Sequence, residues 1–297
     1  MCIRDRWYQP ENAYCKDGML IIEGRKEKHA NPHYDPEGKN WQTTRKEAEY
    51  TSASLTTRGK FSWLYGRFEI RARFSPREGM WPAFWTLGVK EKWPMCGEID
   101  IMEYYQSTYL ANLCWGSPKK DVAKWSTTYT PLKWLQEKHA DWADSFHVFR
   151  MDWDEKEVRL YADDILLNRT PLDNTVNASY KEVANPFRQP HFIILNLALG
   201  ANGGDLDKLP LPQKYEIDYV RIYQKKDSPH KGTIPYRAEK LTVLFRKQEK
   251  GQALRHEKSP IRTNRTGLFK EQKEGQLSLR GPDRNRLPSL RKSFHRA

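Results

Sequence analysis

The sequence of 297 residues predicts an all-β protein, built as a sandwich of two sheets. From residue 49 to residue 223, short segments rich in β-branched and aromatic residues follow one another, separated by Gly, Pro, Asn and Asp. Helical periodicity is convincing only around residues 132–142. Many short strands with so little helix are typical of a sandwich or barrel, and we expect all of them in one domain.

The strands can be placed one by one from their patterns. A turn and a strand are expected over residues 18–24, and a polar, aromatic loop follows over 31–45. A strand is expected over residues 61–74, and in its second half, from Phe68 to Phe74, apolar side chains alternate with charged ones, which predicts one buried face. The other expected strands cover residues 50–57, 81–88, 98–104, 109–115, 146–153, 158–162, 191–199 and 215–223.

The excess positive charge lies in the last quarter of the chain. The sequence carries 51 Lys and Arg against 38 Asp and Glu, a net charge of +13. Residues 225–297 hold 20 basic and 7 acidic side chains, so residues 1–224 are balanced, and all 11 Trp lie between Trp7 and Trp153. We therefore expect a neutral globular domain over 7–224, and a basic, disordered tail over 225–297.

Composition argues against several classes of protein. No stretch approaches about 18 consecutive apolar residues, so no membrane-spanning helix is expected. The tail has only four aromatic residues for base stacking, which disfavours a nucleic-acid binder. The eight His form no cluster and the four Cys have no zinc-ligand spacing, so a transition-metal enzyme is not expected. Cys96 and Cys114 could form a disulfide if their strands pair, or remain buried free thiols.

Three carboxylates within six residues form the most informative pattern of the chain. Glu98, Asp100 and Glu103 are separated by large apolar side chains in an expected strand. Because side chains alternate along a strand, Glu98 and Asp100 share one face, whereas strict alternation would turn Glu103 to the other. One extra residue in a β-bulge near Ile101 or Met102 would return Glu103 to the acidic face.

Crowded carboxylates raise one another's pKa, which is useful where one must donate a proton and another must attack. Retaining glycoside hydrolysis requires such a pair, with the carboxyl groups about 5–5.5 Å apart. A carboxyl between them can share a proton with the nucleophile and hold it in place. An exposed acidic strand face or a divalent-cation site would fit the same spacing, so the pattern alone leaves these alternatives open.

Longer motifs resemble one family of enzymes. The string WPMCGEIDIME, from Trp93 to Glu103, is similar to the signature of glycoside hydrolase family 16, the family of laminarinases and β-glucanases. The resemblance extends over about Trp7 to Gln224, and it implies a concanavalin A-like jelly roll of two curved antiparallel sheets with a cleft on the concave one. Further segments match the family in order and spacing at residues 50–53, 65–69, 79–85, 146–147, 151–153, 194–198 and 215–223.

The resemblance implies a role for each carboxylate. Glu98 would be the nucleophile, Asp100 its assistant and Glu103 the general acid/base of an endo-acting, retaining hydrolase. The implied substrate is a β-linked polysaccharide, β-1,3-glucan (laminarin) or mixed-linkage β-glucan, and the chemistry requires no cofactor. The alternatives are a transglycosylase on the same scaffold and a non-catalytic, lectin-like domain. The lectin alternative predicts the loss of a carboxylate, whereas all three are present.

Aromatic and amide side chains are the candidate sugar contacts. Indole rings stack on the C–H faces of pyranose rings, and we expect Trp81 and Trp115 to face the cleft. Trp85 is a further candidate, and Trp93 is expected in a loop at the cleft edge. Asn196 interrupts an apolar run, so it is expected to bond sugar hydroxyls, or alternatively to satisfy backbone groups.

The resemblance also implies features outside the cleft. Asp218 and a backbone carbonyl near Gly66 would hold a structural calcium on the convex side, and the alternative is a surface aspartate paired with arginine. Residues 1–6 match nothing in the family, and we expect an N-terminally truncated domain that lacks its first strands. The chain shows no signal peptide, but family members imply an extracellular, periplasmic or cell-surface location. We expect a monomer whose partner is its polysaccharide.

Overall fold

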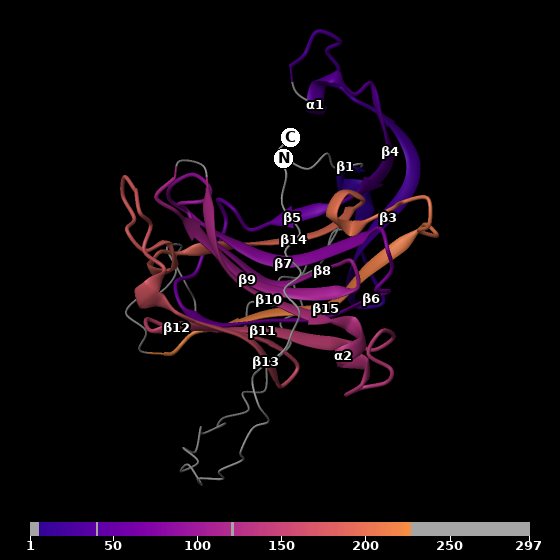
Figure 1. Cartoon of the computed structure of the whole chain (residues 1–297). Helices are drawn as coiled ribbons and strands as arrows, with labels where there is room; N and C mark the ends of the chain where they lie inside the picture. Colours follow the sequence, from indigo (N-terminus) through magenta and orange to yellow (C-terminus); the bar gives the residue numbers. More distant parts are fainter. Residues whose placement is uncertain (1–5, 40, 120–121, 227–297) are drawn as a thin grey trace, which may run out of the picture. The chain divides into compact units, whose positions relative to one another are not determined.

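The computed structural model describes residues 6–39, 41–119 and 122–226, and they form two stacked, curved β-sheets (Figure 1). In these residues the larger sheet has nine strands in the order β1-β4-β3-β15-β6-β11-β12-β13, with β2 paired to β3. Its strands are β1 (Arg6–Tyr8), β2 (Ala13–Lys16), β3 (Met19–Ala30), β4 (Glu47–Ser52), β6 (Gly66–Phe74), β11 (His147–Trp153), β12 (Glu157–Ala162), β13 (Ile165–Pro171) and β15 (Gln213–Tyr223).

The smaller sheet has six strands in the order β10-β9-β8-β7-β14-β5, and every pairing in it is antiparallel. Its ends rise away from the larger sheet (Figure 1). The predicted all-β sandwich is confirmed. The six strands are β5 (Ser54–Thr56), β7 (Met80–Gly88), β8 (Glu98–Tyr105), β9 (Thr108–Gly116), β10 (Ala123–Pro131) and β14 (His191–Leu199).

One hydrophobic core lies between the two sheets. The alternation predicted in β6 is confirmed, because Phe68, Ile70 and Ala72 are buried while the charged residues between them are not. Ile99 and Leu113 of the smaller sheet belong to the same core. Side chains on the other face of the six-stranded sheet, which we call its outer face, do not join this core.

Four strands and the length of one helix were not predicted. The helix expected over 132–142 is only α2 (Leu132–Gln136), and α1 (Trp41–Thr44) is the other short helix of the described residues. β1, β2, β10 and β13 lack an apolar period. β10, for example, has the sequence AKWSTTYTP, in which neither face of the strand carries a row of aliphatic side chains.

The predicted β-bulge is confirmed in β8. Asp100 pairs with Asn112 of β9, and Glu103 pairs with Leu110, so two residues of β8 lie opposite one residue of β9. These two residues, Ile101 and Met102, are both buried in the core. The extra residue therefore returns Glu103 to the outer face, as strict alternation would not.

The structure describes only part of the segments that we expected to precede and follow the domain. Arg6, which we assigned to an unrelated start, is the first residue of β1, and its buried guanidinium donates to the Leu199 carbonyl at 3.4 Å. Residues 1–5 and the expected tail beyond Lys226 lie outside the described residues. Among the described residues, no helix is long and apolar enough to cross a membrane. Cys96 and Cys114 are buried free thiols, so the disulfide alternative is wrong.

Candidate active site

The outer face of the six-stranded sheet gathers the three carboxylates along β8. Glu98 lies between Leu87 of β7 and Cys114 of β9 in the strand register. Asp100 is almost completely buried, with 2% of its surface exposed, whereas Glu98 and Glu103 are half-buried. One carboxyl therefore sits deep in the sheet surface, with a more accessible carboxyl on each side of it.

The surroundings of Asp100 favour the protonated form of its carboxyl group. Burial raises the pKa of this carboxyl well above its usual value of 3.8, and the negative charges of Glu103 and Glu98 raise it further. A hydrogen bond from Asn112 acts in the opposite direction, and the hydrogen bond between Asp100 and Glu98 again raises the Asp100 pKa. Two carboxyl groups can share a hydrogen bond only if one is protonated, and the raised pKa of Asp100 favours Asp100 as the donor and Glu98 as the acceptor.

Two indole N–H groups hold the outer carboxylates. Trp93, in the loop between β7 and β8, donates to Glu98 Oε2 at 2.6 Å. Trp81 of β7 donates to Glu103 Oε1 at 3.0 Å. Each of these two carboxyl groups thus accepts a hydrogen bond from an indole of a different element, which orients it before any ligand arrives. The structure places Trp81 on the outer face and Trp93 in an exposed loop beside Glu98.

Trp85 and Asn196 also lie on the outer face, and they contact each other. Trp85 Nε1 donates to Asn196 Oδ1 at 2.7 Å, and Asn196 is buried in β14. In the register, Trp85 lies opposite Asp100. The polar residue in this apolar strand therefore orients an indole ring beside the carboxylates, a function that we had not assigned to it.

Trp115 does not face the carboxylates, and our expectation for it was wrong. Its side chain is buried in the core, with its ring edge against Phe187 at a centroid distance of 6.4 Å. The reason is register: Cys114 pairs directly with Glu98, so the next residue along β9 must point to the opposite face. Family position suggested Trp115, but alternation assigns the outer face to Cys114.

Sequence reasoning missed two residues of β9 that contact the carboxylates. Asn112 donates to the Asp100 carboxyl and is buried. Cys114 is buried too, and its pKa is raised by burial and then by the nearby Glu98 and Asp100 carboxyl groups, which favours the neutral thiol. Asn112 could have been found from the sequence, because it is the one polar residue in the run YLANLCW.

The residues expected to hold calcium do not come together. Gly66 lies at the Tyr223 end of the β6–β15 ladder, and Asp218 is five residues away along β15, about 17 Å at the rise of a strand. The Asp218 carboxylate instead accepts from Arg71 Nη1 at 2.7 Å. In the described part of the chain, no group of three or more His, Cys, Asp or Glu side chains could hold a metal ion.

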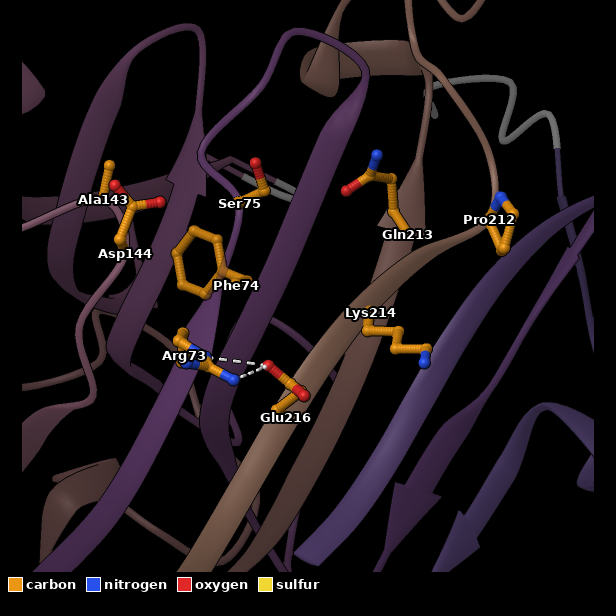
Figure 2. Close-up of a pocket in the computed structure, with 9 residues that line it drawn as sticks. All are labelled: Arg73, Phe74, Ser75, Ala143, Asp144, Pro212, Gln213, Lys214 and Glu216. Atoms are coloured by element: carbon orange, nitrogen blue, oxygen red, sulfur yellow. Dashed lines mark hydrogen bonds and ion pairs between the residues drawn. The ribbon is translucent and has the colours of Figure 1, made fainter. Parts of the chain in front are cut away.

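A hollow of about 370 Å³ lies elsewhere, where β6 of the larger sheet ends and β15 begins (Figure 2). Arg73 and Glu216 line it and form an ion pair at 2.8 Å, and Gln213 and Lys214 lie above them in the view. None of the three carboxylates of β8 lines this hollow. A polymer can lie along an open sheet face and needs no enclosed cavity, so the carboxylate chemistry identifies the outer face as the candidate active site.

Two oriented carboxyl groups on one open sheet face, with a third carboxyl between them, are the kind of site that glycosidases use. The family model of glycosyl hydrolases family 16 matches residues 24–221, and the chain belongs to this family. It is therefore a glycosidase.

Relatives and solved structures agree with this assignment. The chain is 35% identical to a beta-glucanase of Rhodothermus marinus over 232 residues, which cover 72% of this chain and 71% of the relative. It is 34% identical to a glucan endo-1,3-beta-glucosidase of Cryptopygus antarcticus over 206 residues, 65% of this chain and 68% of the relative. The laminarinase catalytic domain of Thermotoga maritima superposes with a TM-score of 0.61 at 33% identity, covering 75% and 84% of the two chains.

Proposed function

We propose that the protein is an endo-acting hydrolase of β-1,3-glucan or mixed-linkage β-glucan, and that it retains the anomeric configuration. The observation that carries the proposal is the bulged strand, which brings Glu98 and Glu103 to one face with Asp100 between them. A double displacement needs two such carboxyl groups, because one must attack while the other donates a proton.

In the first step, Glu98 attacks the anomeric carbon as a carboxylate, and Glu103, which enters this step in its protonated form, gives its proton to the oxygen of the departing sugar. The proton that Asp100 shares with Glu98, together with the indole N–H of Trp93, orients the attacking carboxylate. The bond to the leaving oxygen breaks, and a glycosyl ester forms on Glu98. Trp81 keeps the Glu103 carboxyl directed at the departing oxygen through its 3.0 Å hydrogen bond.

In the second step, Glu103 removes a proton from water, and the water oxygen attacks the same carbon. The ester bond breaks, and Glu98 leaves as a carboxylate that again accepts from Asp100. Two inversions at one carbon give net retention. A polymer as substrate also implies that the enzyme acts outside the cytoplasm, where such polymers occur.

The test uses the full chain and two isosteric variants, Glu98→Gln and Glu103→Gln. Hydrolysis of laminarin, mixed-linkage β-glucan and a galactan is followed by reducing ends, viscosity and NMR of the first-formed anomer. We expect each variant to lose about 100- to 10,000-fold in kcat. The product should be β-configured, and viscosity should fall early in the reaction. Asp218→Asn, on the other sheet, is the matched control and should remain active.

Three results would contradict the proposal. They are a Glu98→Gln variant that keeps more than a tenth of the activity, an α-configured first product, and a wild-type chain that cleaves none of the glucans. Transfer to an added sugar in place of water would show a transglycosylase on the same site.

A further inference from the structure

The edge strand β10 continues the outer face beyond the carboxylates. Its residues Trp125 and Tyr129 pair with Cys114 and Leu110 of β9, and these in turn lie opposite Glu98 and Glu103 of β8. Directly opposed residues of a sheet share a face, so both aromatic side chains belong to the outer face. Across the strands, Trp125 therefore lies in one row with Cys114 and Glu98, and Tyr129 lies in one row with Leu110 and Glu103.

The other side of β10 confirms this orientation. The Ser126 hydroxyl is hydrogen-bonded to the Thr170 hydroxyl of β13 at 2.7 Å, and Thr130 is buried. The even-numbered side chains of β10 are therefore turned toward the larger sheet. The odd-numbered ones, among them Trp125 and Tyr129, are turned away from it.

The two aromatic side chains are exposed, with accessible fractions of 47% for Trp125 and 68% for Tyr129. Two strand spacings separate them from the Glu98 and Glu103 positions, about 10 Å, which is more than one sugar ring. Along β10 they lie about 13 Å apart, with Thr127 between them on the same face. Edge strands usually carry charges that prevent association, so two exposed rings here require another explanation.

We propose that Trp125 and Tyr129 form an outer binding platform for the polysaccharide chain, beyond the sugars that flank the cleaved bond. The inference rests on the proposed function, and the continuity of the two rows with Glu98 and Glu103 favours the glucan over a protein partner. Pyranose rings stack on aromatic faces, and the Thr127 hydroxyl between the rings suits sugar hydroxyls. A protein partner would require a contiguous apolar patch. Among the described residues of β10 on this face, Thr127 separates the two rings, so they do not form such a patch.

The platform is asymmetric. At the opposite edge of the same face, β5 presents Ser54 and Thr56, which pair with Asn196 and Ile194. These small hydroxyl side chains offer no stacking surface. The chain should therefore bind more strongly on the β10 side of the cleaved bond, and longer substrates should gain affinity from that side only.

The experiment compares Trp125→Ala, Tyr129→Ala and the double variant with wild type on laminarin and on a laminari-trisaccharide. We expect the KM for laminarin to rise about 3- to 10-fold in each single variant, and further in the double variant, with kcat unchanged. The trisaccharide places at most two sugars on the β10 side, so it reaches no further than the edge of the platform and should lose much less affinity than laminarin. Trp125→Phe, which keeps a ring, should recover most of the affinity.

Trp134→Ala is the matched control, because Trp134 of α2 is 40% exposed and lies outside this face. It should leave both substrates unchanged. An unchanged laminarin KM in the double variant, or an equal loss on the trisaccharide, would overturn the platform. Far-ultraviolet circular dichroism is used to check that each variant is folded.

A binding assay separates failure of the platform from failure of the proposed function. Retardation in laminarin gels is measured in the inactive Glu98→Gln chain, with and without Trp125→Ala. Wild-type cleavage with equal retardation of the two chains would refute the platform and leave the function standing. A wild-type chain that neither cleaves nor is retarded by any glucan would refute the function itself.

Discussion

Replacing Asp100 by Asn tests the idea that a shared proton supports the nucleophile. The substitution keeps the size of the side chain, which is 2% exposed, so folding should persist. The amide can still donate to Glu98, but it cannot exchange a proton or adjust its charge as Glu98 changes from carboxylate to ester. The hydrogen bond from Asn112 to Asp100 also loses its strongest acceptor.

The size of the effect follows from the hydrogen bonds that change. A hydrogen bond to a charged group contributes about 1.5–3 kcal/mol, and each 1.4 kcal/mol is a factor of ten. If the bond strengthens as charge moves during attack, the loss in kcat is about 10- to 100-fold. That is less than the loss expected for Glu98→Gln, because the attacking group remains.

The same variant should change the pH dependence of stability. Burial raises the Asp100 pKa in the folded chain, so between pH 3.8 and that raised value the folded chain keeps a proton that the unfolded chain releases. The free energy of unfolding contributed by this group therefore falls as pH rises through that window. Asp100→Asn removes the titration, so its stability relative to wild type should increase with pH.

Two measurements test the proton shared by Asp100 and Glu98. They are kcat on laminarin and the urea midpoint of unfolding from pH 4 to 9. Asp218→Asn, in which an aspartate on the larger sheet is changed, serves as the control and should alter neither. Wild-type kcat in Asp100→Asn, together with a stability difference that does not depend on pH, would refute the shared proton.

The remaining predictions concern three other side chains. Trp81→Phe removes the 3.0 Å hydrogen bond to Glu103 and keeps an aromatic ring, so kcat should fall about 10-fold with little change in KM. A change in KM alone would contradict this role of Trp81. Trp115→Ala should lower the free energy of unfolding by about 3–5 kcal/mol in urea titrations and leave KM unchanged, because the side chain is in the core; a raised KM at full stability would place it on the outer face. Burial lowers the pKa of His191 to about 4 from 6.5, so its contribution to stability is complete above pH 6.5 and should be lost, by about 3 kcal/mol, as pH falls from 6.5 to 4. A His191→Gln variant with the same acid slope in urea midpoints would contradict this.

The sequence predicted those parts of the site that depend on neighbours along one strand. Glu98, Asp100 and Glu103 share β8, and their spacing was enough to predict the bulge that brings them to one face. Trp115 was misplaced because its orientation depends on which residue of β9 lies opposite Glu98. That register is a pairing between strands, and no local pattern in either strand contains it.

Distant pairings explain the other differences as well. β10 was not predicted, because its outer side chains lie on an open face and its inner ones bond β13 rather than an apolar core. Gly66 and Asp218 were placed together by family position, whereas the β6–β15 register separates them. In both cases the missing information was the alignment of strands far apart in the chain.

The curvature of the six-stranded sheet bears on the distance between the Glu98 and Glu103 carboxyl groups. Glu98 and Glu103 lie opposite Leu87 and Ala83, so four residues of β7 separate their backbone positions, about 13 Å. A double displacement needs the carboxyl groups about 5–5.5 Å apart, and side chains on the inside of a bend converge at their tips. A flatter sheet would open the pair toward the roughly 6.5–9.5 Å at which water fits between them and the reaction inverts. We therefore expect core substitutions that flatten the sheet beneath β8 to change the spacing of the two carboxyl groups, and with it the stereochemical outcome, although they lie far from the carboxylates.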